Sequence, residues 1–143
     1  MKTKFAITLF LMLFLYGCAN PTASNVVNTL NKQSEQDGSP FRWVSQNVSG
    51  GGAVMHRALI PLPSAPTKAD ETLNKDTLAL INKAEQSKGR SNATIRDVKH
   101  MQDGKEVWIL NSAKESIGYI VNFQPSPQGG IDINLSGPFA FKE

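Results

Sequence analysis

Few side chains in this chain of 143 residues have types and spacings that could do chemistry. The two histidines, His56 and His100, lie in strand-like runs and belong to no His-x-His or His-Glu-x-x-His pattern that would hold a metal ion. No Gly-x-Ser-x-Gly or Ser-x-x-Lys pattern offers an activated serine. The sequence therefore predicts no metal, no cofactor and no catalytic residue, although a carboxylate pair like that of a glycosidase would become visible only in the folded chain.

The other reactive side chain belongs to Cys18, the single cysteine. It follows two basic residues, Lys2 and Lys4, and an apolar stretch from Phe5 to Tyr16. A basic start followed by an apolar run of this length is typical of a secretory signal peptide. A segment that crosses a bilayer needs about 20 apolar residues, so a cleaved leader is favoured over a membrane-spanning anchor.

The residues Leu15-Tyr16-Gly17-Cys18 resemble the lipobox of bacterial lipoproteins. The resemblance implies cleavage between Gly17 and Cys18 and acylation of the Cys18 thiol, which would hold the mature protein on a lipid membrane. Lipoproteins kept in the inner membrane tend to have Asp after this cysteine, whereas this chain has Ala19. The resemblance thus favours the periplasmic face of the outer membrane. It covers the leader only, and we recognise no family in the remaining chain.

Charge argues against nucleic acid as a partner. The chain has fifteen Lys and Arg against twelve Asp and Glu, a net charge of +3. Lys2 and Lys4 leave with the leader, so thirteen basic residues oppose twelve acidic ones and the net charge falls to +1. The basic residues are scattered singly, whereas a nucleic-acid surface needs a basic patch.

We expect three parts in the precursor: a signal peptide (1–17), a lipidated polar tether (18–40) and a single domain (41–143). About 126 residues remain after cleavage, which is enough for one hydrophobic core. No cysteine is left to form a disulfide, so an ordinary core must stabilise the domain.

The tether is rich in Asn, Ser, Thr and Gln. Within it, Ser24 could cap a helix of one or two turns that places Val26, Val27 and Leu30 on one side. One interpretation is a solvated spacer between lipid and domain. The other is that this apolar stripe docks on a partner or on the domain itself.

The segment 41–143 predicts an α+β fold with one main helix over 67–88. Apolar residues recur there at helical spacing, and Asp70 stands three residues after Thr67, a variant of the capping box. The adjacent carboxylates of Asp70 and Glu71 suit the positive end of a helix dipole better than an acid–base pair.

Strand-like stretches surround that helix. The glycine-rich segment 49–52 reads as a hairpin loop, because no Gly-Lys-Ser/Thr follows to make a phosphate site. Asp103-Gly104 predicts a second hairpin, and the continuously apolar run 107–110 is typical of a central strand. We therefore expect an antiparallel sheet of about five to six strands that ends in a β-meander, with the helix packed on one face. The expected strands are 41–46, 53–60, 93–102, 105–110, 117–123 and 131–136.

The connection between the last two strands is long for a hairpin and combines stiff prolines with permissive glycines. Loops held by a rigid sheet are common recognition sites, although a plain surface turn is the other interpretation. The candidate interaction residues are Pro125, Ser126, Pro127, Gln128, Gly129 and Gly130.

Two functional hypotheses follow. The favoured one is a non-enzymatic lipoprotein that binds another envelope protein, as an accessory or assembly factor of a secretion, pilus, conjugation or exclusion apparatus. The alternative is a small cell-envelope hydrolase or ligand-binding lipoprotein. It requires a pocket in which groups such as Asp97, Asp132, His56 and His100 come together.

Overall fold

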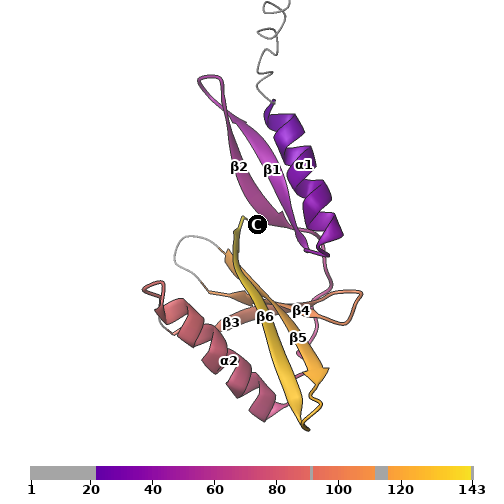
Figure 1. The fold of residues 1–143 in the computed structure, drawn as a ribbon. Coiled ribbons are helices and arrows are strands. Elements are labelled where there is room, and N and C mark those ends of the chain that lie inside the picture. The colour runs from indigo at the N-terminus through magenta and orange to yellow at the C-terminus, as the bar shows by residue number, and fades with distance from the viewer. Residues whose placement is uncertain (1–21, 91, 112–115, 143) are drawn as a thin grey trace, which may run out of the picture.

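The computed structural model describes residues 22–90, 92–111 and 116–142 (Figure 1). The chain is an α+β protein with antiparallel strands, as the sequence predicted. Along the chain the elements are α1 (Ala23–Gln36), β1 (Phe41–Val48), β2 (Gly52–Leu59), α2 (Glu71–Gln86), β3 (Ile95–His100), β4 (Glu106–Leu110), β5 (Ser116–Pro125) and β6 (Ile131–Phe141).

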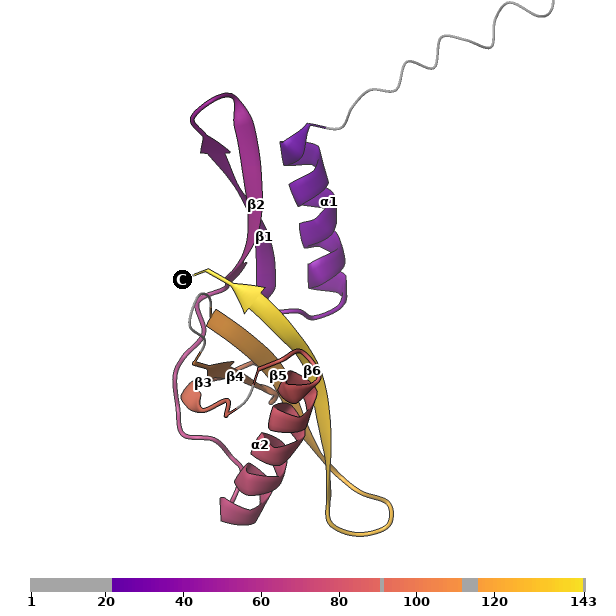
Figure 2. The same cartoon turned by 90° about the vertical axis from the view of Figure 1, so that its left-hand side faces the viewer.

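The strands form two sheets, whereas we expected one. β3, β4, β5 and β6 make a four-stranded sheet in chain order, the expected meander, and β1 pairs with β2 alone. The two sheets meet where β6 ends, because the Lys142 amide donates to the Arg57 carbonyl at 2.8 Å in a parallel bridge beside Ala58. Figures 1 and 2 show the β1–β2 hairpin projecting from the larger sheet, with α1 beside it.

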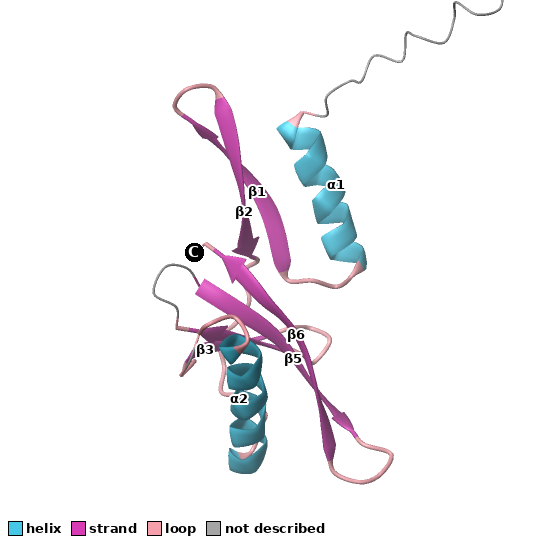
Figure 3. Cartoon of the chain, turned by 60° about the vertical axis from the view of Figure 1, so that its left-hand side comes forward, coloured by secondary structure: helices cyan, strands magenta, loops and turns pink. Residues whose placement is uncertain are grey.

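The central strand β4 is buried on both faces, as its apolar run predicted. Trp108 and Leu110 face α2 and pack in a cluster with Ile81 of that helix. Val107 and Ile109 point to the opposite face, where they pack with Phe41, Phe141 and neighbouring apolar residues. Figure 3 shows α2 on one side of the larger sheet and the β1–β2 hairpin beyond one end of that sheet. The first residue of β1 thus belongs to the core of the larger sheet.

The helix α2 starts at Glu71, four residues later than expected. Asp70 is its N-cap, and its carboxylate accepts a hydrogen bond from the Leu73 amide at 2.8 Å. Thr67, which we expected to open the helix, instead donates to the Glu106 carboxylate at 2.7 Å. The segment before α2 is therefore bound to the sheet and cannot wind into the first turn.

The sequence located the turn between β3 and β4 correctly but not the end of the last strand. Asp103-Gly104 forms the predicted turn between β3 and β4, and Gly104 adopts a φ of +86° that other residues rarely take. The last strand, expected over 131–136, continues past Gly137-Pro138, a cis peptide, as far as Phe141. A shift of register between Gly118 and Ile120 lets β5 and β6 resume pairing there.

Within the stretch expected to be a tether, residues 23–36 form a helix of 14 residues instead of one or two turns. Its N-cap is Thr22 and not Ser24. Val26, Val27 and Leu30 are half-buried, and α1 packs against β1, in agreement with the interpretation that the stripe docks on the domain. In the sequence, residues 19–22 separate Cys18 from the helix.

Candidate recognition groove

Of the site residues that the sequence singled out, Gly17 and Cys18 lie outside the described residues. The predicted cleavage and lipidation site therefore stays a prediction. The described part of the chain contains no helix long and apolar enough to cross a membrane.

The predicted interaction loop closes the β5–β6 hairpin. Pro125 is the last residue of β5, and Ser126 closes the turn by donating its amide to the Gly130 carbonyl at 3.0 Å and accepting the Gly129 amide at 3.0 Å. Pro127 and Gln128 at the tip are exposed. The loop lies at the end of the molecule opposite the start of α1 (Figure 2). It has the geometry of an internally bonded turn, and it gathers no charged side chain of its own.

The four groups named for a hydrolase are spread over three strands, with Asp97 and His100 in β3, His56 in β2 and Asp132 in β6. Asp97 bonds Ser64 and Lys99, and the Lys99 ammonium lowers the pKa of its carboxyl. Asp132 lies near the far end of the β5–β6 hairpin, and His56 lies in β2. His100 is 2.9 Å from the Pro66 carbonyl. Among the described residues, no group of three His, Cys, Asp or Glu side chains could hold a metal ion.

Two buried carboxylates, which sequence reasoning missed, fasten α2 and the chain before it to the sheet. Glu106 is fully buried and accepts hydrogen bonds of 2.7 Å from the Thr67 hydroxyl, the Lys68 amide and the Trp108 indole. His100 Nε2 lies 3.7 Å from the same carboxylate. Because two of these donors, Thr67 and Lys68, belong to the segment before α2, the buried Glu106 carboxylate holds that segment in place.

Glu85 does the same at the other end of α2. Its carboxylate pairs with Arg90 and accepts a 2.5 Å hydrogen bond from the Tyr119 hydroxyl. Burial, with the neighbouring Glu85 carboxylate, raises the pKa of Tyr119 above its ordinary value. The phenol therefore stays protonated and keeps donating to Glu85.

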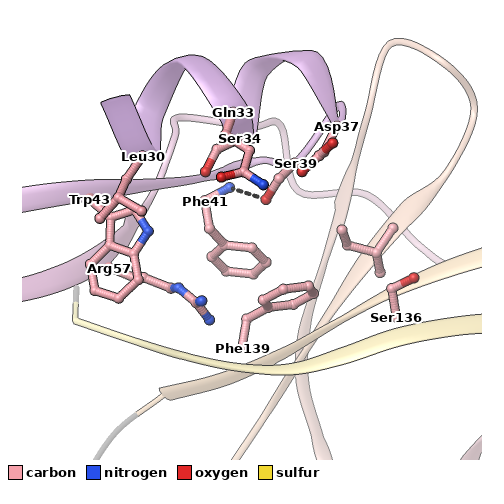
Figure 4. A pocket seen from close by; sticks show the side chains of 11 residues that line it. Leu30, Gln33, Ser34, Asp37, Ser39, Phe41, Trp43, Arg57, Ser136 and Phe139 are labelled. Atoms are coloured by element: carbon pink, nitrogen blue, oxygen red, sulfur yellow. Dashed lines mark hydrogen bonds between the residues drawn. The ribbon is translucent and has the colours of Figure 1, made fainter. Parts of the chain in front are cut away.

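A groove of about 400 Å³ opens between the end of α1, the base of the β1–β2 hairpin and the larger sheet (Figure 4). It lies where the two sheets meet, so it has walls from elements far apart in the sequence. Its lining residues are Leu30, Gln33, Ser34, Asp37, Ser39, Phe41, Trp43, Arg57, Ile120, Ser136 and Phe139.

Aromatic rings form one wall of this groove. Phe41 stacks on Phe139 with ring centroids 4.7 Å apart and an interplanar angle of 27°. Trp43 continues the wall along β1 (Figure 4). The side-chain amide of Asn31 fixes the Trp43 backbone, because it accepts from the Trp43 amide at 2.7 Å and donates to the Trp43 carbonyl at 2.9 Å. The wall is thus held in place from α1.

Arg57 supplies a positive charge against that wall. Its guanidinium lies 4.7 Å from the Trp43 ring centroid and 5.5 Å from that of Phe139. This arrangement gives cation–π attraction to both rings. No carboxylate of the described residues lies within 4.0 Å of the guanidinium. The groove therefore offers a guanidinium with no ion-pair partner beside an apolar surface, with the Asp37 carboxylate elsewhere in the lining. This combination suits a carboxylate or other anion attached to an apolar group.

The sequence contains one signal for this groove. Trp43 and Arg57 face each other because the β1–β2 register pairs them directly. That register follows once the glycine-rich loop is centred between the two strands. Phe139, however, reaches the groove only through the meeting of the two sheets, which no local pattern predicts.

Comparisons of this chain with models of protein families, with curated proteins and with solved structures found no match.

Proposed function

We propose that this chain is a bacterial lipoprotein, anchored through Cys18 on the periplasmic face of the outer membrane, that binds another envelope protein without catalysing a reaction. The lipobox-like Leu15-Tyr16-Gly17-Cys18 supports the anchor. The single observation that carries the binding role is the guanidinium of Arg57, which lies against the aromatic wall of the groove without an ion-pair partner among the described residues.

The chemistry of the groove matches that of protein contacts. Trp and Arg are enriched among the residues that contribute most to binding energy, and such residues cluster in pockets. A partner segment with an apolar side chain next to a carboxylate would stack on Phe139 and Trp43 and pair with Arg57. Because Arg57 is already held against two rings, little side-chain freedom is lost on binding.

The size of the groove also supports the alternative, a ligand-binding lipoprotein. A volume of about 400 Å³ lies within the range of small-molecule sites, roughly 300–1,000 Å³. A small anion with an apolar part would use the same wall and the same guanidinium. The experiment must therefore separate a protein occupant from a small one.

Site-specific photo-crosslinking in intact cells makes that separation. A benzoylphenylalanine placed at Ser136, on the groove, should give one crosslinked protein band, and the same group at Lys83 on α2 should give none. Arg57→Glu should abolish the band, whereas Lys83→Glu should leave it unchanged. The alternative would be supported by a different result. Neither crosslinker position would then give a protein band, and native mass spectrometry would show a small molecule bound to the purified parent protein but not to Arg57→Glu.

A further inference from the structure

One end of the molecule is formed by the start of α1 and the tip of the β1–β2 hairpin. The views in Figures 1 to 3 agree that both point the same way, so Thr22, the N-cap of α1, lies at that end. Asn31 and Trp43 lie at the same height along the long axis of the hairpin, because the Asn31 side chain is hydrogen-bonded to the Trp43 backbone. From that level Ala23 lies about 12 Å along the helix at 1.5 Å per residue. Val48 lies about 17 Å along the strand at about 3.3 Å per residue.

This end carries no formal charge. No Asp, Glu, Lys or Arg occurs from Thr22 to Asn31 or from Trp43 to His56. Such residues make up 19% of the chain, so two stretches of this length would ordinarily contain several. We call residues 22–31 and 44–55 together the uncharged end.

The uncharged end also exposes apolar side chains. Val48 is 44% exposed and Val54 is 48% exposed. The register places Val54 opposite Gln46 and Val48 opposite Gly52, so the two valines lie on the same face of the hairpin. Val44, 39% exposed, continues that face toward the body. A row of exposed valines without a charge is unusual on a surface that meets only water.

We propose that the uncharged end rests on the bilayer, with the hairpin tip at the level of the lipid headgroups. The inference rests on the proposed anchoring of Cys18. Four residue steps separate Cys18 from Thr22 and span at most about 14 Å. An acylated Cys18 lies at the membrane surface, so the start of α1 is held within that distance and the tip, which extends a few ångströms further, reaches the headgroups.

The chemistry of the tip fits that position. The valines gain by leaving water, and no charged side chain has to be desolvated. The loop Ser49-Gly50-Gly51 has backbone groups that need partners, and the headgroup region supplies water for them where the hydrocarbon core would not. The long axis of the molecule then stands away from the membrane, with the groove beneath the hairpin and the 125–130 loop farthest from the lipid.

A fluorescence experiment tests the contact without relying on acylation in the cell. The mature chain from Cys18, produced without the leader, is coupled through its single thiol to a maleimide lipid. The vesicles contain phosphatidylethanolamine and phosphatidylglycerol with brominated acyl chains. Ser49→Trp places a reporter at the tip, and Gln128→Trp places a matched reporter at the opposite end. The fluorescence of the native tryptophans is measured on the unsubstituted protein and subtracted.

We expect bromine to quench the Ser49→Trp signal at least twofold and to leave the Gln128→Trp signal unchanged. Combining Val54→Asp with Ser49→Trp should remove most of the quenching. Combining Ile131→Asp with Ser49→Trp should not, although Ile131 has the same exposed fraction of 48% as Val54. Circular dichroism shows whether each variant folds. Equal quenching at both positions, or none at Ser49, would overturn the inference. Mass spectrometry of the protein from cells tests the acylation separately.

Discussion

The two helices of this protein are attached to their strands in different ways. α2 is fixed by buried groups, because Thr77, Ile81 and Glu85 are almost fully enclosed. None of the fourteen residues of α1, all of them described, is buried, and its polar links to β1 are the amide of Asn31 and a 3.6 Å ion pair between Glu35 and Arg42. The difference indicates that the larger sheet with α2 stabilises the molecule, whereas α1 and the hairpin form a surface that other molecules can reach.

The largest effect should come from Glu106→Ala. Removing this carboxylate leaves the Trp108 indole without its acceptor inside the core and takes the acceptor from the Lys68 amide. We expect the free energy of unfolding, measured in urea, to fall by about 3–5 kcal/mol. The matched control is Asp103→Ala in the same hairpin, whose exposed pair with Lys105 should contribute less than about 1 kcal/mol. Equal losses would show that burial does not set the difference.

The Tyr119 hydroxyl gives the next effect, and it depends on pH. In the folded chain its pKa is raised, so unfolding releases a proton once the pH exceeds the ordinary value of 10.0. Its stabilisation is therefore complete below pH 10 and is lost as the pH rises above it. Tyr119→Phe should cost about 2 kcal/mol at neutral pH and weaken the fall in stability above pH 10.

An optical titration checks the same point directly. The chain has two tyrosines, and Tyr16 belongs to the predicted leader, so Tyr119 is the single tyrosine of the mature chain. Tyrosinate absorbance at 295 nm should appear only as the protein unfolds. Ionisation near pH 10 with the far-ultraviolet circular dichroism intact would contradict the contact with Glu85.

Asn31→Ala should have a smaller and local effect. The Trp43 amide and carbonyl lose their partner, and α1 has no buried residue to hold it. We expect a loss of about 1 kcal/mol, with hydrogen exchange accelerated over α1 and at Trp43 and unchanged in β4. Asn28→Ala, an exposed position on the same helix, is the control. Protection lost throughout the larger sheet would mean that the two regions unfold as one.

The smallest change in stability is expected for Arg57→Gln. Only cation–π contacts with Trp43 and Phe139 are lost, at about 0.5–1 kcal/mol. Binding of the proposed partner should nevertheless be lost. A variant that folds as well as the parent yet still crosslinks at Ser136 would separate the groove from the binding role.

Local patterns predicted the fold where neighbouring residues decide it. The central strand at 107–110 and the turn at Asp103-Gly104 were predicted correctly. A strand buried on both faces requires a continuous apolar run, and a positive φ favours glycine, so both features can be recognised in the sequence. The start of α2 was wrong because Glu106, far along the chain, binds Thr67. A strand glutamate normally reads as solvent-exposed, so its burial could not be foreseen.

The groove was harder to predict than the strands that form it. Its aromatic wall combines Phe41 and Trp43 with Phe139, and these come together only when two sheets meet. Alternation of apolar residues gives the inward face of each strand but not the partner of that face. The division of six strands into two sheets was missed for the same reason.

The amide of Asn31 has one more consequence. A hairpin that projects from its body exposes two backbone edges, and such edges readily add strands from other chains and grow into aggregates. Asn31 occupies the donor and the acceptor of Trp43 on one of these edges, as a neighbouring strand would. A strand from another chain could therefore pair with β1 at Trp43 only by displacing the Asn31 side chain, which opposes edge-to-edge association at that residue.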